Sequence, residues 1–148
     1  EAICVQVDAG SSEDIIRLLG GKLYALGFVK DGFIEATLAR EASMPTGLPL
    51  GGEFNAALPH VDIEYVNQSA LALATLTQPV DFMNMVDDQE AVPVRLVIML
   101  ALDQPKSQIA MLQEVSRILQ KPDIVSQLVA AENSAEVISI LSSPSDTA

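Results

Sequence analysis

A histidine and an arginine stand at the two ends of one loop in this chain of 148 residues. His60 is the only histidine, and it follows Pro59 after a short run of small and apolar residues. A neutral imidazole can attack phosphorus at physiological pH, because its unperturbed pKa is near 6.5. Arg40 offers a rigid fork of donors that suits phosphoryl oxygens. The two residues together favour phosphoryl chemistry with His60 as the acceptor.

Each of these residues also has a plainer interpretation. A lone histidine is often a surface residue or a hydrogen-bonded core residue. The loop position of His60, the glycines before it, which let a partner surface come close, and the arginine favour a functional role. Arg40 could instead be a solvated residue at a helix end, where a cation complements the dipole. Glu41 could orient Arg40 or simply be exposed.

Other kinds of site are not supported by the residues available. A zinc site built by protein alone needs about three or four nitrogen or sulfur ligands, and the chain has one histidine and one cysteine. It contains neither a phosphate-binding glycine loop nor a nucleophile elbow. No metal or cofactor is therefore expected. Cys4 has no C-x-x-C partner and is predicted to be a structural residue in or near the first strand.

The composition indicates an acidic globular domain. Hydrophobic residues make up 49% and charged residues 19% of the chain, and the net charge is -12. Such a charge argues against nucleic-acid and membrane-surface binding and favours a basic protein partner. No apolar run reaches the roughly 20 residues of a spanning helix, and the acidic start lacks the basic region of a signal peptide. A cytoplasmic protein without membrane insertion is expected.

Hydrophobic patterning predicts alternating strands and helices. Strands are expected over 3–7, 54–58, 69–77, 80–85 and 92–102, and residues 87–90 are expected to form a solvated acidic turn. Helices are expected from Ser11–Ser12 to Gly27, from Asp31–Gly32 to about Arg40–Glu41, and from Asp103, Pro122 and Ser134, with Ile109 among the inward-facing residues. The Gly20–Gly21 pair predicts close packing in the first helix.

This alternation predicts a single α/β domain over 1–141, with a mixed β-sheet flanked by helices on both faces, and a loose tail over 142–148.

The segment from Arg40 to His60 resembles the active-site segment of a known family. It contains R-E at a helix end, then P-T-G, a glycine-containing loop and P-H. That order is similar to the IIA components of the bacterial sugar phosphotransferase system, fructose/mannitol class. The strand, loop and helices over 94–125 resemble the same family, and the P-T-G loop is most similar to the galactitol-type branch. The resemblance covers roughly residues 11–141.

The resemblance implies a role for each candidate residue. His60 matches the phosphorylated histidine, which would take its phosphoryl group from the carrier protein HPr and give it to a cysteine of the cognate IIB component. Arg40 matches the arginine that stabilises this group. Gln108 stands where many members have a second histidine, so a phosphoryl contact there would come from an uncharged amide.

The family resemblance leaves two functions open. One is a transport component, for which the sugar would be selected by the membrane component IIC. The alternative is a regulatory IIA-like module whose His60 phosphorylation state controls a protein partner. The receiving chemistry at His60 is the same in both.

Overall fold

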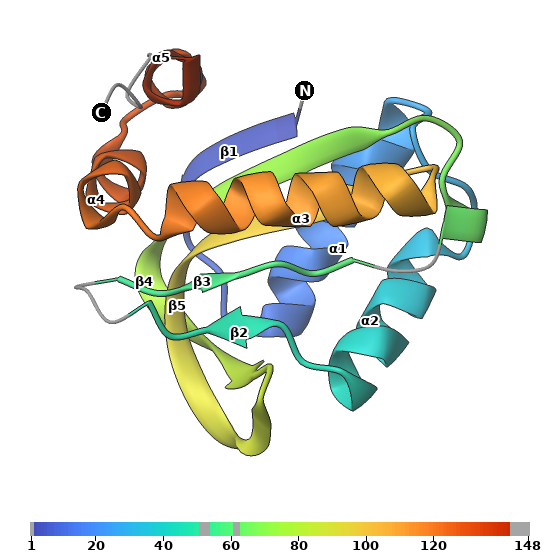
Figure 1. Ribbon diagram of the computed structural model, residues 1–148, viewed down its shortest axis with the longest axis horizontal. Coiled ribbons are helices and arrows are strands. Elements are labelled where there is room, and N and C mark those ends of the chain that lie inside the picture. The colour runs from blue at the N-terminus through green and yellow to red at the C-terminus, as the bar shows by residue number, and fades with distance from the viewer. Residues whose placement is uncertain (1, 51–53, 61–62, 143–148) are drawn as a thin grey trace.

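The protein folds as one mixed β-sheet with helices packed on both faces (Figure 1). The computed structural model describes residues 2–50, 54–60 and 63–142. The expected tail beyond Ser142 therefore lies outside the described residues. Helix α3 crosses one face of the sheet, and α1 and α2 lie on the other. The predicted fold class, a single α/β domain with a mixed sheet, is confirmed.

Within the described residues, five strands and five α-helices make up the fold. The strands are β1 Ala2–Val7, β2 Gly47–Leu48, β3 Ala56–Ala57, β4 Ala70–Asn84 and β5 Asp87–Ala101. The helices are α1 Ser12–Ala25, α2 Phe33–Ser43, α3 Pro105–Leu119, α4 Pro122–Ala130 and α5 Ser134–Ser142, with a 3-10 turn at Ile63–Tyr65. β4 pairs antiparallel with β5 and parallel with β1, while β3 runs parallel to β5. The short β2 joins β3 to the far end of β4.

Local sequence signals account for the ends of the first two helices. The Ser11 hydroxyl accepts a hydrogen bond from the Asp14 N–H at 3.2 Å, and two acids follow in the first turn of α1. Gly27 leaves this helix with φ 83°, and Gly32 precedes α2 with φ 90°. α2 continues to Ser43, past the predicted end at Arg40–Glu41, because the helix-breaking Pro45 comes later.

The strand predictions need three corrections. Residues 47–48 were expected to lie in a loop and form β2. The two strands expected over 69–77 and 80–85 are one strand, β4, whose pairing with β5 shifts register between Thr75 and Val80. The acidic run 87–90 is the beginning of β5, not a turn, because the hairpin turns earlier, at Met85–Val86. Asp87, Gln89 and Glu90 are exposed, as predicted, since a strand extending beyond the helices can leave charged side chains in water.

Two apolar clusters, one on each face of the sheet, form the core. Ile15, Leu19 and Phe33 of α1 and α2 belong to one cluster, and Val115 and Leu128 of α3 and α4 belong to the other. Ile109 was predicted to face inward and is 60% exposed, so that prediction is wrong. It lies in the second turn of α3, where the described neighbours at 106 and 110 are also exposed. The buried contacts of α3 lie further along the helix.

Three glycines differ in how closely they are packed. A Cβ atom at Gly20 would lie 2.7 Å from the Ile34 side chain, so the predicted close packing of α1 holds at this residue. Gly21 has no atom within 4 Å of a Cβ position, so it does not share that packing. At Gly47 a Cβ would lie 2.6 Å from the carbonyl oxygen of Met83. The missing side chain of Gly47 therefore lets β2 approach β4 within the molecule.

Replacing Gly47 by alanine is expected to destabilise the protein by about 1–3 kcal/mol, because a backbone carbonyl cannot move aside as a side chain can. Gly21→Ala is the matched control, and it is expected to stabilise the protein by about 0.5–1 kcal/mol, since alanine is the better helix former. Denaturant unfolding of both variants measures the difference. A Gly47→Ala protein as stable as the unmodified chain would contradict this account.

Candidate functional site

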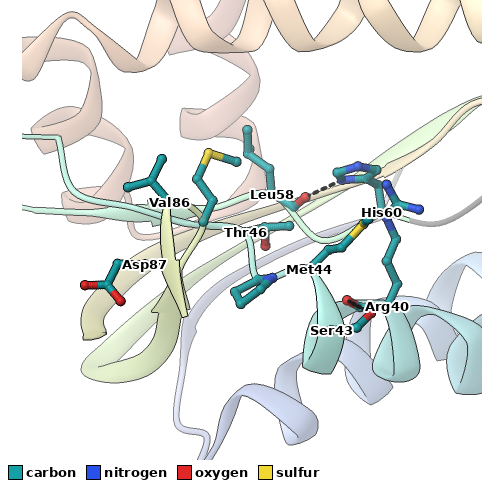
Figure 2. Close-up of a pocket in the computed structure, with 10 residues that line it drawn as sticks. Arg40, Ser43, Met44, Thr46, Leu58, His60, Val86 and Asp87 are labelled. Carbon is teal, nitrogen blue, oxygen red and sulfur yellow. Dashed lines mark hydrogen bonds between the residues drawn. The ribbon is translucent and has the colours of Figure 1, made fainter. Parts of the chain in front are cut away.

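The two residues predicted to act together line one pocket. Arg40 comes from the last turn of α2, and His60 comes from the segment that follows β3. The pocket has a volume of about 780 Å³. In Figure 2 the half-buried Arg40 side chain extends toward the His60 ring, while Asp87 lies at the opposite end. The described residues that line it are Arg40, Ser43, Met44, Pro45, Thr46, Leu58, His60, Met85, Val86 and Asp87.

Pairing with β5 determines where His60 lies. Residues 56, 57 and 60 pair in parallel with 96, 97 and 100, so the segment follows β5 without a change of register. The Leu100 N–H donates to the Pro59 carbonyl at 3.0 Å. Proline has no N–H, so its carbonyl is the only backbone group that it can offer to the pairing. His60 is therefore held near the carboxyl end of β5, just before the chain enters α3.

A backbone carbonyl determines which nitrogen of His60 carries the proton in the neutral ring. The ring nitrogen Nδ1 lies 2.8 Å from the Leu58 carbonyl oxygen (Figure 2). A carbonyl oxygen only accepts hydrogen bonds, so Nδ1 carries the proton in the neutral ring. Nε2 then holds the lone pair. Any nucleophilic attack by the neutral His60 ring would therefore come from Nε2.

Glu41 was expected either to orient Arg40 or to be exposed, and the second interpretation is wrong, while the first stays a prediction. It is half-buried, and its carboxylate accepts hydrogen bonds from the Thr46 N–H at 2.8 Å and from the Thr46 hydroxyl at 2.8 and 3.1 Å. Burial raises the pKa of Glu41, and the hydrogen bonds from Thr46 act in the opposite direction. Glu41 therefore ties the end of α2 to the P-T-G loop.

The third candidate, Gln108, lies in the first turn of α3. Its side chain is outside the described part of the structure. The backbone of Gln108 follows soon after the part of β5 that pairs with His60. His60 pairs with Leu100 near the end of β5, and α3 begins at Pro105. Whether its amide contacts a group on His60 stays a prediction.

Sequence reasoning missed the residues that form the rim of the pocket. Met44, Met85 and Val86 are 58%, 43% and 85% exposed, and they come from the end of α2 and the tip of the β4–β5 hairpin. The hairpin tip carries no motif that links it to His60, so only the fold reveals its place. The sequence did indicate Thr46, since it is the central residue of the P-T-G motif.

The described residues contain no group of three or more His, Cys, Asp or Glu side chains arranged to hold a metal ion. Within the same residues, no helix combines the length and apolar character needed to cross a membrane. Cys4 is half-buried in β1, and burial raises the pKa of its thiol, which favours the unreactive neutral form.

Comparison with known proteins identifies the class to which this fold and pocket belong. The family described as "Phosphoenolpyruvate-dependent sugar phosphotransferase system, EIIA 2" matches residues 1–143. The chain therefore belongs to this family and is a sugar phosphotransferase system IIA component. The family resemblance in the Arg40–His60 segment is thus confirmed.

One relative makes the assignment more specific, and two solved structures share the fold. The galactitol-specific EIIA component of Escherichia coli (strain K12) is 35% identical over 116 residues, which are 78% of this chain and 76% of that protein. This similarity agrees with the branch indicated by the P-T-G loop. The crystal structure of IIA mannitol from Escherichia coli matches with a TM-score of 0.78 at 25% identity, covering 95% of both chains. A complex of enzyme IIA mannitol with phosphorylated enzyme IIB mannitol from Escherichia coli matches with a TM-score of 0.76 at 24% identity, covering 94% of this chain and 92% of that one.

The neutral His60 ring is expected to be the tautomer with hydrogen on Nδ1, because the Leu58 carbonyl can only accept. Long-range proton–nitrogen NMR spectra of the imidazole, recorded above the pKa of the ring, distinguish the two nitrogens. A protonated nitrogen signal at Nδ1 and an unprotonated one at Nε2 is the expected result. The reverse pattern would contradict the assignment of Nε2 as the nucleophile.

Proposed function

We propose that His60 accepts a phosphoryl group from phosphorylated HPr and passes it to a cysteine of the cognate IIB component during sugar uptake. The observation that supports this most directly is the hydrogen bond between Nδ1 and the Leu58 carbonyl. It leaves the lone pair on Nε2, in a pocket that also contains the Arg40 guanidinium. A nucleophile beside a cation is what transfer of a phosphoryl anion requires.

In the receiving step, Nε2 of His60 attacks the phosphorus of the phosphohistidine on HPr. The bond between that phosphorus and the donor imidazole breaks, and the donor ring leaves with the bonding electron pair. The phosphorylated His60 ring keeps its proton on Nδ1 and so carries a positive charge. Its hydrogen bond to the Leu58 carbonyl then becomes charge-assisted, which stabilises the product. The passing step is the same displacement with a cysteine thiolate of IIB as the nucleophile.

Arg40 and Gln108 are proposed to act on the phosphoryl oxygens. The transition state of such a transfer is loose, with charge spread over three equatorial oxygens, so alignment and charge stabilisation supply most of the catalysis. The Arg40 guanidinium can donate two parallel hydrogen bonds to them. Gln108 would add an uncharged donor from the first turn of α3. A smaller contribution is expected from it, since hydrogen bonds between neutral groups are weaker.

The rim of the pocket suits a protein partner. Met44, Met85 and Val86 expose apolar side chains around the pocket that holds His60, and exposed apolar patches with polar surroundings mark protein interaction sites. Unbranched methionines adapt to more than one partner, as acceptance and donation by different proteins would require. The net charge of -12 favours a basic HPr surface through electrostatic steering.

The transport role is favoured over the regulatory one by the galactitol-specific relative, which is 35% identical to this chain over most of its length. In that role the partners would be HPr, IIB and, through IIB, the membrane component IIC. The sugar would be bound by IIC and would not contact His60.

The protein is expected to acquire one acid-labile phosphoryl group when it is incubated with phosphoenolpyruvate, enzyme I and HPr. Intact-protein mass spectrometry measures the adduct, and His60→Gln is expected to abolish it because it lacks a nucleophilic ring. If the adduct is absent from the unmodified protein or persists in the variant, the proposal is wrong.

The same assay measures how much Arg40 and Gln108 each contribute to the rate of phosphorylation. Arg40→Ala is expected to slow phosphorylation by at least tenfold, because it removes the charge that stabilises the transition state. Gln108→Ala should slow it less. Arg17→Ala is the matched control, since Arg17 is an exposed arginine that pairs with Glu13 and Glu35 and is absent from the lining of the His60 pocket. A rate for Arg40→Ala equal to that of Arg17→Ala would exclude Arg40 from the site.

Phosphorylated protein mixed with a galactitol-type IIB is expected to lose its phosphoryl group to the IIB cysteine. Mass spectrometry of both proteins at short times follows this transfer, and a IIB variant with serine at that cysteine is the control. Retention of the group on His60 in the presence of intact IIB would favour the regulatory alternative.

A further inference from the structure

We infer that Glu41 is a positioning residue for His60 and acts through Thr46. The geometric part of this inference concerns the orientation of the imidazole and stands by itself. The kinetic part rests on the proposed function, because it concerns the rate at which His60 is phosphorylated.

The first step is the contact between Glu41 and the loop. The Glu41 carboxylate accepts both donors of Thr46, the backbone N–H at 2.8 Å and the hydroxyl at 2.8 and 3.1 Å. Thr46 is only 3% exposed, so these bonds are largely protected from competition with water. They close residues 41–46 into a compact turn and hold the loop against the end of α2.

The second step leads from Thr46 to the nucleophile. The carbonyl of Thr46 accepts the Leu58 N–H at 3.3 Å, and the carbonyl of Leu58 accepts the Nδ1–H of His60 at 2.8 Å. Both ends of the Leu58 residue are therefore engaged, one by the loop and one by the imidazole. A displacement of Thr46 would shift Leu58 and with it the oxygen that fixes the His60 ring.

The third step concerns Arg40, which precedes Glu41 in the last turn of α2. Consecutive residues of a helix point about 100° apart, so the two side chains face different surroundings. Arg40 lines the pocket of His60, whereas Glu41 lines a neighbouring pocket of about 450 Å³ formed by α1, α2 and β4. The Glu41 carboxylate thus links the end of α2, which carries Arg40, through Thr46 to the segment after β3 that carries His60.

The cost of this arrangement supports a positional role. Placing a carboxylate where it loses water is unfavourable unless hydrogen bonds compensate, and burial raises the pKa of Glu41 even though both donors of Thr46 oppose that shift. An apolar residue would fill the same space without this cost. Glu35, on the same helix, has a side chain that is 72% exposed and pairs with Arg17 at the surface. It provides a matched control.

The experiment compares four variants, Glu41→Gln, Thr46→Val, Thr46→Ser and Glu35→Gln. Glutamine keeps the shape of Glu41 but has no charge and only one acceptor oxygen, so the Thr46 hydroxyl must turn and accept from its N–H₂ if the Thr46 N–H keeps its partner. Valine keeps the shape of threonine and its N–H but removes the hydroxyl, whereas serine keeps both donors. Each variant is assayed below its unfolding temperature for the proton and nitrogen NMR signals of the His60 ring, and for kcat and KM with phosphorylated HPr.

Glu41→Gln and Thr46→Val are expected to shift the His60 Nδ1 signal, to speed exchange of its proton with water, and to lower kcat on the order of tenfold. KM for HPr should not change, because neither Glu41 nor the buried Thr46 belongs to the exposed rim of the pocket. Glu35→Gln should match the unmodified protein, and Thr46→Ser, which keeps both donors, should recover most of what Thr46→Val loses. Unchanged ring signals and an unchanged kcat in a folded Glu41→Gln or Thr46→Val protein would overturn the inference. The same holds if these variants lose stability but keep the ring signals and kcat of the unmodified protein.

The NMR and kinetic measurements separate this inference from the proposed function. An unmodified protein that is never phosphorylated would refute the proposed function, while altered His60 signals in Glu41→Gln would still support the geometric role of Glu41. An unmodified protein that is phosphorylated, with variants indistinguishable from it in both measurements, would refute the inference alone.

Discussion

The antiparallel pairing between β4 and β5 is the interaction on which the rest of the structure depends. These two strands lie between the two apolar clusters, so every helix packs directly or indirectly against them. They also provide the edges along which the shorter segments align, since β1 pairs with β4 and β3 pairs with β5. A sheet covered on both faces excludes water from its ladder, and this makes the register of each attached segment well defined.

The candidate site is a consequence of that register. The segment carrying His60 follows β5, and its pairing with residues 96, 97 and 100 leaves the imidazole beside the end of the strand. α2 packs on the opposite side through the cluster that contains Phe33, and its last turn brings Arg40 to the same pocket. Two residues at opposite ends of a loop thus meet because different elements hold them, and the Glu41–Thr46 contact joins those elements directly.

The proposed function would require His60 to hold a phosphoryl group firmly enough to accept it and weakly enough to release it. The arrangement around His60 fits that requirement. One backbone carbonyl fixes the tautomer, the Arg40 guanidinium lines the same pocket, and exposed apolar side chains of Met44, Met85 and Val86 surround it.

The sequence by itself determined the α/β alternation, the helix start at Ser11 and the glycine at the end of α1, because these depend on local propensity. It also indicated His60 and Arg40 as candidate residues, and both line one pocket. Only the tertiary structure decided that 87–90 belongs to a strand, that Ile109 faces outward, that Glu41 binds Thr46, and that the tip of the β4–β5 hairpin borders the pocket. Each of these depends on which segments meet in space. The spacing of residues along the chain does not record such contacts, because they arise from packing between elements far apart in sequence.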